Sequence, residues 1–104
     1  MTDAAASTRT PEGYLLFELD IFDRATFDAY AANARPILAA FGASLMINSS
    51  QIEPLEGEWT PVSLVMVKFP SIERARDFYN CDEYQKIIGQ RMRSARSRGV
   101  LLAG

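Results

Sequence analysis

Arg91 is the residue whose type and position carry the most chemistry in this chain. Three- and four-residue spacing places it on the apolar stripe of a predicted C-terminal helix, beside Ile87 and Ile88. A guanidinium there needs a carboxylate or a bound anion, because an unpaired buried charge is costly. Arg91 therefore either clamps the carboxylate of a small acid, snorkels to solvent, or forms a structural ion pair with Glu18 or Asp20.

Four further side chains are candidates for a site. Glu18 lies mid-strand and acts either as a general base or as the partner of a cation. Trp59 either walls a pocket or anchors its loop against the core. Tyr79 and Tyr84 come close at a helix junction. Their hydroxyls either donate to a ligand oxygen or form hydrogen bonds within the protein core. The candidate ligand-binding residues are therefore Arg91, Trp59, Tyr79 and Tyr84, and the catalytic candidate is Glu18.

The chain lacks the residues that several common chemistries require. None of its 104 residues is histidine, which excludes Ser-His-Asp and Cys-His catalysis, His-ligated zinc and haem with a proximal histidine. The single cysteine, Cys81, excludes an intramolecular disulfide framework and a Cys-rich metal centre. We expect no cofactor and no metal.

Charge and hydropathy limit the classes of partner. Eleven Lys and Arg against thirteen Asp and Glu give a net charge of −2, which argues against nucleic acid. The cluster of arginines from Arg91 to Arg98 is better explained as a solvated face near a helix C-terminus. No apolar run approaches the ~20 residues that span a bilayer, and the first ten residues lack a secretory core. We expect a cytoplasmic protein without membrane contact.

Periodicity predicts the elements that must position these side chains. Helix starts are expected at Asp23, Ser71 and Asp82, the last in a capping-box pattern with Gln85. The first helix is expected to break or kink at Pro36 and to end at Gly42. Strands are predicted over residues 14–21, 43–48 with a continuation at 51–55, 62–69 and 100–102.

This order of elements defines an α+β fold. It is the ferredoxin-like βαββαβ arrangement, an antiparallel sheet with helices on one face, formed by residues 13–104 after a disordered tail of residues 1–12. The other face of the sheet would expose Leu16, Leu64 and Met66. An apolar face of that kind is usually an interface, so we expect a homodimer through the open sheet face.

Several short strings resemble one family when taken in order. They are Gly57-Glu58-Trp59-Thr60-Pro61, Phe69-Pro70-Ser71, Phe78-Tyr79-Asn80, Glu83-Tyr84-Gln85, Arg91, Ser97-Arg98 and Gly104. From about Gly13 to Gly104 the chain resembles the domain of unknown function 1330 family, in the dimeric α/β-barrel superfamily. The resemblance implies two subunits whose sheets form a shared barrel. Superfamily relatives include cofactor-independent monooxygenases, muconolactone isomerases and haem-degrading enzymes.

The chain departs from the family pattern at several positions. Asn48-Ser49-Ser50 stands where Arg-Gly-Gly is common, and Ala103 replaces a typical glutamate; these two changes remove two charges. Gly42-Ala43 replaces the usual Gly-Gly of the family, and Cys81-Asp82 replaces a typical Ser-Pro. If the missing charges bind a ligand in relatives, this chain has altered or lost that ligand.

Two functions remain open at this stage. One is a small-molecule-binding protein or cofactor-independent enzyme of the dimeric α/β-barrel type, acting on a small acidic or aromatic compound. The other is a non-catalytic homodimeric interaction module. A cavity close to Arg91 that holds unexplained density would favour the first, and a closed, fully packed interior with an unpocketed surface the second.

Overall fold

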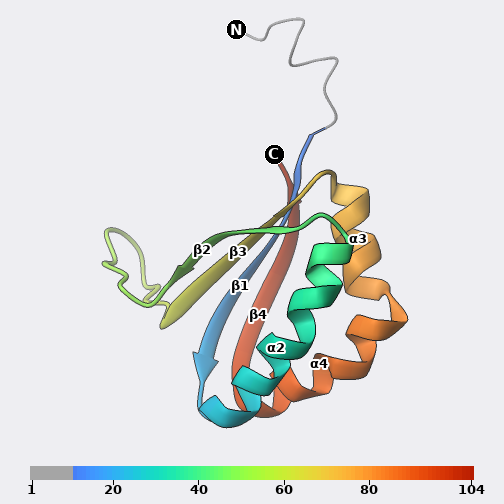
Figure 1. The fold of residues 1–104 in the computed structure, drawn as a ribbon. Coiled ribbons are helices and arrows are strands. Elements are labelled where there is room, and N and C mark those ends of the chain that lie inside the picture. Colours follow the sequence, from blue (N-terminus) through green and yellow to red (C-terminus); the bar gives the residue numbers. More distant parts are fainter. Residues whose placement is uncertain (1–10) are drawn as a thin grey trace, which may run out of the picture.

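The computed structural model describes residues 11–104, so most of the predicted tail lies outside the described residues. Seven elements follow one another (Figure 1). They are β1 (Gly13–Ile21), α2 (Arg24–Ala40), β2 (Ser44–Ser49), β3 (Ser63–Phe69), α3 (Ile72–Asn80), α4 (Asp82–Ser94) and β4 (Ala95–Ala103).

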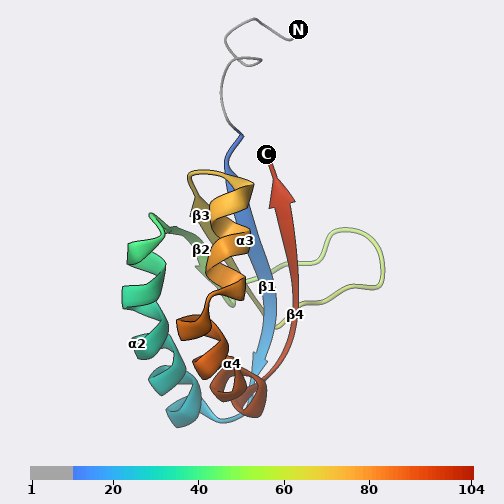
Figure 2. The same cartoon turned by 90° about the vertical axis from the view of Figure 1, so that its right-hand side faces the viewer.

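The four strands form one antiparallel sheet in the order β2-β3-β1-β4. All three helices cover the same face of this sheet (Figure 2). Because side chains alternate along a strand, the odd-numbered residues of β1, such as Leu15 and Leu19, point toward the helices. The expected α+β, ferredoxin-like βαββαβ fold is confirmed.

The helix ends follow the expected capping chemistry with one exception. Asp23 and Ser71 accept hydrogen bonds from the backbone N–H groups of the first turns of α2 and α3. The predicted capping box of Asp82 and Gln85 does not form, because Cys81 caps α4 instead. Its Sγ accepts from the Tyr84 backbone N–H at 3.4 Å, and Asp82 is already helical.

The helix α2 differs from expectation in its middle and agrees at its end. It continues without a break across Pro36. It ends before Gly42, which has a positive φ of 74°, the left-handed conformation that favours glycine. A Cβ at this position would also approach the Pro70 ring at 3.1 Å, so the turn brings α2 close to the end of β3.

Two strand predictions were wrong. Residues 51–55 do not pair, because the Ser49 hydroxyl accepts from the Gln51 backbone N–H and turns the chain out of the sheet. Within β2 itself the register shifts between Leu45 and Ile47. The final strand begins at Ala95 rather than at residue 100, so Arg96 and Arg98 lie on β4, while Arg91 and Arg93 lie in the last turn of α4.

The core lies between the helices and the sheet and is rich in aromatic rings. Phe78 from α3 packs against Tyr84 at 4.4 Å and against Phe69 at 5.4 Å between ring centroids. Tyr84 and Phe69 are almost fully buried. Rings in these tilted arrangements add to the burial of apolar surface and fix α3 and α4 on the sheet.

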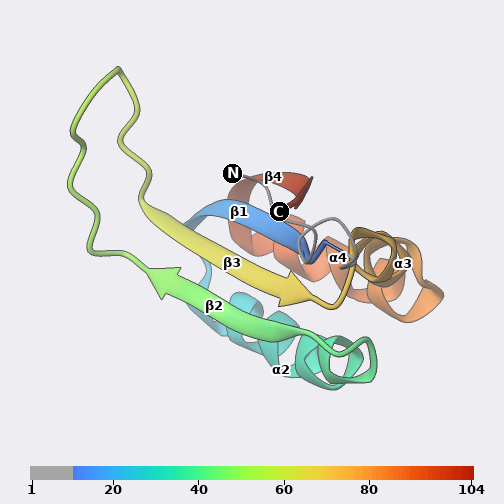
Figure 3. The same cartoon turned by 90° about the horizontal axis from the view of Figure 1, so that it is seen from above.

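The sheet face opposite the helices is uncovered. Strand register places Ile47, Met66, Leu16 and Val100 side by side, in one row that crosses all four strands. Figure 3 looks at the molecule from above, with the four strands as one layer and the helices on one side of it. The expected open apolar face is therefore present.

Glu12, which the sequence places in the tail, is bonded to the sheet. Its carboxylate accepts from the Tyr14 hydroxyl and pairs with Lys68 at 3.4 Å. Its carbonyl accepts from the backbone N–H of Gly104 at 3.0 Å. Among residues 11–104, no helix is long and apolar enough to span a membrane.

Candidate functional site

The end of α4 is fixed at the point that determines where Arg91 lies. Ser94 is fully buried, and its carbonyl accepts from the backbone N–H groups of Phe22 and Asp23 at 2.9 and 3.1 Å. The Ser94 hydroxyl donates to the Gln90 carbonyl at 2.6 Å. These bonds tie the last turn of α4 to the turn between β1 and α2. They hold Arg91, one turn earlier, against the sheet.

Arg91 is only 4% exposed, as the helical spacing predicts. Its Nε donates to the Tyr84 hydroxyl at 3.3 Å, and its Nη1 donates to the Ser97 hydroxyl at 2.5 Å. The guanidinium carbon lies 4.6 Å from the centroid of the Phe17 ring, a cation–π distance. Residues from β1, α4 and β4 thus hold this one cation.

The charge of Arg91 is not neutralised within the described chain. All its contacts there are with neutral groups, and no carboxylate of residues 11–104 forms an ion pair with it. Its side chain also hydrogen-bonds to Tyr30, which is again a neutral group. A buried cation normally has an anionic partner, and no carboxylate of residues 11–104 supplies one to Arg91.

Tyr84 connects Arg91 to a second tyrosine. The Tyr84 and Tyr30 hydroxyl oxygens lie 2.7 Å apart. Burial raises the pKa of Tyr30 well above its usual range, and the neighbouring Tyr84 raises it further. Tyr30 therefore stays protonated. Since Tyr84 accepts from Arg91 and can donate to Tyr30, the Tyr30 hydrogen is available to a third group.

Gly99 explains how Phe17 reaches its position under Arg91. The two residues are directly opposite in the β1–β4 register. A Cβ at Gly99 would meet the Phe17 ring, with Cδ1 at 2.6 Å, so the ring occupies the space that any other residue would fill. Glycine is needed at position 99 because the Phe17 ring packs closely against its backbone, and not because the chain turns there.

Two cavities meet at Arg91, and both are bordered by Leu15, Phe17 and Arg91. The one between α2 and the sheet, here called the α2 cavity, has a volume of about 640 Å³. Its polar lining includes Tyr30, Tyr84 and Asn48. The one beneath the edge strand β4, the β4 cavity, has about 590 Å³ and includes Arg76, Tyr79 and Ser97. No carboxylate lines either cavity.

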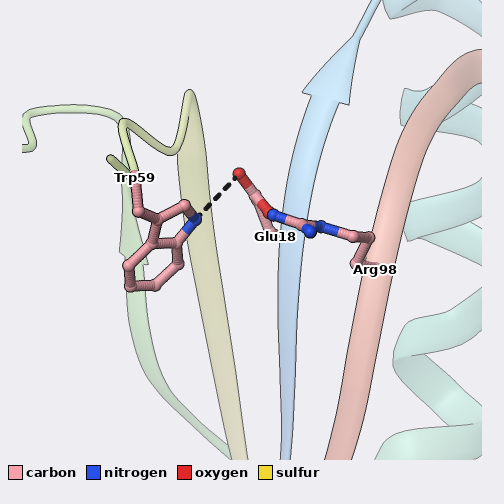
Figure 4. Close-up of polar contacts among 3 residues, drawn as sticks. All are labelled: Glu18, Trp59 and Arg98. Carbon is pink, nitrogen blue, oxygen red and sulfur yellow. Dashed lines mark hydrogen bonds and ion pairs between the residues drawn. The ribbon is translucent and has the colours of Figure 1, made fainter. Parts of the chain in front are cut away.

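Glu18 and Trp59 lie away from both cavities, on the open face of the sheet. The Glu18 carboxylate accepts from Arg98 Nε at 2.9 Å and Nη2 at 2.6 Å, and from Trp59 Nε1 at 3.3 Å (Figure 4). Glu18 is therefore not the partner of Arg91. Trp59 ties its loop to β1 through this bond, but it is 49% exposed and does not pack against the core as expected.

Comparison with known proteins agrees with this architecture. Residues 12–104 match a domain of unknown function, DUF1330. The chain belongs to this family. No curated protein matches it significantly.

Solved structures show the same fold at low sequence identity. A protein of unknown function from Rhodopseudomonas palustris, RPA0582, superposes with a TM-score of 0.74 at 15% identity, covering 96% of this chain and 87% of that one. SnoaB, a cofactor-independent oxygenase from Streptomyces nogalater, gives a TM-score of 0.62 at 11% identity, covering 91% and 94%. These matches show that this DUF1330 chain shares its fold with RPA0582 and SnoaB.

The structure brings three of the four candidate ligand-binding residues together. Arg91 and Tyr84 are bonded, and Tyr79 packs on Tyr84 at 5.7 Å between ring centroids. Tyr79 faces the β4 cavity and Tyr84 the α2 cavity, so the two tyrosines serve different spaces. Trp59 is the candidate that does not join this group, because it lies on the open face of the sheet beside Glu18.

Sequence reasoning missed Tyr30, Phe17 and Ser97 as members of the site. Helical and strand spacing place Tyr30 and Phe17 on ordinary apolar faces, and their types give no other signal. Ser97 could have been found: extending the strand alternation back from Leu101 through Gly99 places it on the helix-facing side. Within residues 11–104, no group of three or more Cys, Asp or Glu side chains could hold a metal ion.

Proposed function

We propose that this protein binds a small organic anion with an apolar or aromatic body in the α2 cavity, with Arg91 as the residue that holds the anionic group. The observation that carries the proposal is the unneutralised guanidinium of Arg91, 4% exposed at the edge of a cavity of about 640 Å³. That volume is in the range of small-molecule pockets.

Two donors of the site would meet the ligand. Arg91 and Tyr30 both line the α2 cavity, and the Tyr30 hydroxyl hydrogen is free if Tyr84 donates to Tyr30. An oxyanion placed between them would receive a charge-assisted hydrogen bond from Arg91 and a second bond from Tyr30. Because Arg91 also polarises Tyr84, the three groups act as one donor chain.

The rest of the cavity suits the body of such a ligand. Its walls are mainly apolar and include Phe27, Leu38, Val65 and Phe78. A ring or alkyl body would be desolvated there, while the anionic end reaches Arg91. A simple inorganic anion would leave these walls unused.

The chemistry that fits this arrangement is stabilisation of an anion. Donors fixed in a site of low water content favour the conjugate base of an activated phenol, enol or acid. Proton transfer or oxygenation of an activated aromatic or acidic compound belongs to that class, and neither needs a bound cofactor. SnoaB, a cofactor-independent oxygenase, shares the fold at 11% identity, which makes this reaction class a reasonable one to test.

We also propose that the protein assembles as a homodimer through the open sheet face. The row of Ile47, Met66, Leu16 and Val100 is continuous across the four strands, and a monomer leaves it in contact with water. A second copy packed on this face would cover the row. It would leave both helix-side cavities accessible, because they lie on the other side of the sheet.

Thermal unfolding with paired ligands tests the binding proposal. Benzoate, salicylate and short aliphatic dicarboxylates are each compared with the corresponding neutral amide. At least one acid is expected to raise the melting temperature while its amide does not, since only the acid pairs with Arg91. If no acid stabilises a protein that is dimeric in solution, the non-catalytic interaction module becomes the better account.

Two cavity-filling variants locate the ligand. Ala31→Phe places a ring into the α2 cavity, and Met92→Phe enlarges a side chain that lines the β4 cavity. The acid-induced shift should disappear in Ala31→Phe and persist in Met92→Phe. The opposite pattern would place the ligand beneath β4 and contradict the assignment to the α2 cavity.

A further inference from the structure

The loop between β2 and β3, residues 50–62, leaves the body of the protein and is here called the arm. Figure 1 shows it projecting on the side of the sheet opposite the helices, and Figure 3 shows it curving toward the side on which β4 lies. The arm thus stands over the open face and not over the cavities.

The arm is held at its base and makes no polar side-chain contact beyond it. Trp59 is bonded to Glu18, and Pro61 is buried. Between residues 52 and 58, no side chain forms a hydrogen bond or an ion pair with any other described residue. Leu55, near the tip, is 86% exposed. This apolar side chain is therefore available for burial against another molecule.

The charges of the arm are all of one sign. It carries Glu53, Glu56 and Glu58 and no lysine or arginine. The open face carries the opposite sign on β4, where the side chains of Arg96 and Arg98 are 79% and 76% exposed. Each pairs with one carboxylate of β1, Arg96 only at 3.7 Å, and each keeps donors for a further acid.

The strand β4 also exposes apolar side chains at the edge of the sheet. It is the edge of the sheet and is nine residues long. Val100 and Leu102 are 56% and 37% exposed on it. A long edge strand with exposed apolar side chains is an open site for association unless something packs on it.

We propose that the arm of one subunit packs on β4 of a second copy of this chain, with Leu55 against Val100 and Leu102 and the arm glutamates beside Arg96 and Arg98. The inference rests on the homodimer proposed above and adds to it a specific contact outside the central apolar row. The two-fold symmetry of a homodimer would form this contact twice.

A disulfide test detects the contact directly. In a Cys81→Ser background, where serine keeps the helix cap, the single variants Leu55→Cys and Val100→Cys are mixed and oxidised. A covalent dimer that forms in the mixture and in neither variant alone supports the proposal, because that disulfide joins two chains. A mixture with no such band, from proteins that are dimeric by sedimentation, overturns it.

Sedimentation equilibrium measures what the arm contributes. Leu55→Ser should weaken dimerisation by about tenfold or more, since an apolar anchor is lost from a desolvated contact. Glu56→Lys should weaken it more at low salt than at high salt. Asp77→Lys, an equal charge change on the helix side, is the matched control and should leave the dimer unchanged.

The outcomes separate the two proposals. A wild-type protein that is monomeric at micromolar concentration overturns the homodimer and the arm contact with it. A dimeric wild type whose dissociation constant is unchanged by Leu55→Ser and Glu56→Lys overturns the arm contact alone. Because these side chains make no polar contact within the described chain, weaker dimers in these variants would not result from misfolding.

Discussion

The guanidinium of Arg91 lies over the ring of Phe17, 4.6 Å from its centroid, at the place where the two helix-side cavities meet. The ring gives the cation an apolar but electrostatically favourable surface. It does so without a carboxylate, which would neutralise the charge. The sheet therefore positions Arg91 and leaves its charge available.

Replacing Arg91 should affect binding far more than stability. Arg91→Met keeps the packing of the stem and leaves no carboxylate unpaired within the described chain. We expect the free energy of unfolding in urea to change by less than about 1.5 kcal/mol. A loss of about 3 kcal/mol or more would show that the charge is paired inside the protein.

A methyl group at Gly99 should disturb the site through Phe17. Gly99→Ala would force the Phe17 ring away from β4, and with it the surface under Arg91. We expect a destabilisation of about 1–3 kcal/mol, as for overpacking, and a smaller acid-induced thermal shift. The double variant Phe17→Leu/Gly99→Ala should recover part of the stability. Equal stability of Gly99→Ala and wild type would contradict this account.

Tyr30 should make the protein less stable in alkali. Its pKa is raised in the folded state, mainly by burial, so the unfolded chain loses this proton first as the pH rises through about 10. Unfolding is then favoured by increasing pH. Urea denaturation between about pH 9 and about pH 11 should show a steeper loss for wild type than for Tyr30→Phe. Parallel curves would contradict a protonated, buried Tyr30.

Two truncations should distinguish the contribution of the first ten residues to stability from that of Glu12, which is bonded to the sheet. The first ten residues show no apolar periodicity, so their removal should leave the melting temperature within about 2 °C. Removal of residues 1–12 also deletes Glu12, which bonds Tyr14, Lys68 and Gly104. The melting temperature should then fall further. A large drop with the shorter truncation would show that the tail contributes contacts of its own.

Most of the fold could be predicted from local patterns. Alternation in β1 and β3 and the caps at Asp23 and Ser71 depend on neighbours within a few residues, and these were confirmed. The start of β4 depends on distant contacts. Arg96 and Arg98 have no apolar pattern, and they are in a strand because they pair with Asp20 and Glu18 on β1.

The site could be predicted only in part, for a related reason. The burial of Arg91 follows from helical spacing, but two of its partners, Phe17 and Ser97, come from β1 and β4 and depend on tertiary packing. Trp59 and Glu18 were expected at or near a pocket, yet strand alternation places Glu18 on the opposite face from Phe17. That alternation was visible in the sequence and, applied strictly, separates Glu18 from Arg91.

The binding of the most stabilising carboxylate, measured by titration calorimetry, tests the role of Arg91 most directly. Wild type is compared with Arg91→Met and with Arg93→Met, which removes an exposed arginine of the same helix that lines neither cavity. Arg91→Met should weaken binding by about 30-fold or more, since a charge-assisted hydrogen bond is lost, while Arg93→Met binds as wild type does. Equal affinity of Arg91→Met and wild type would contradict the proposal that this buried cation holds the ligand.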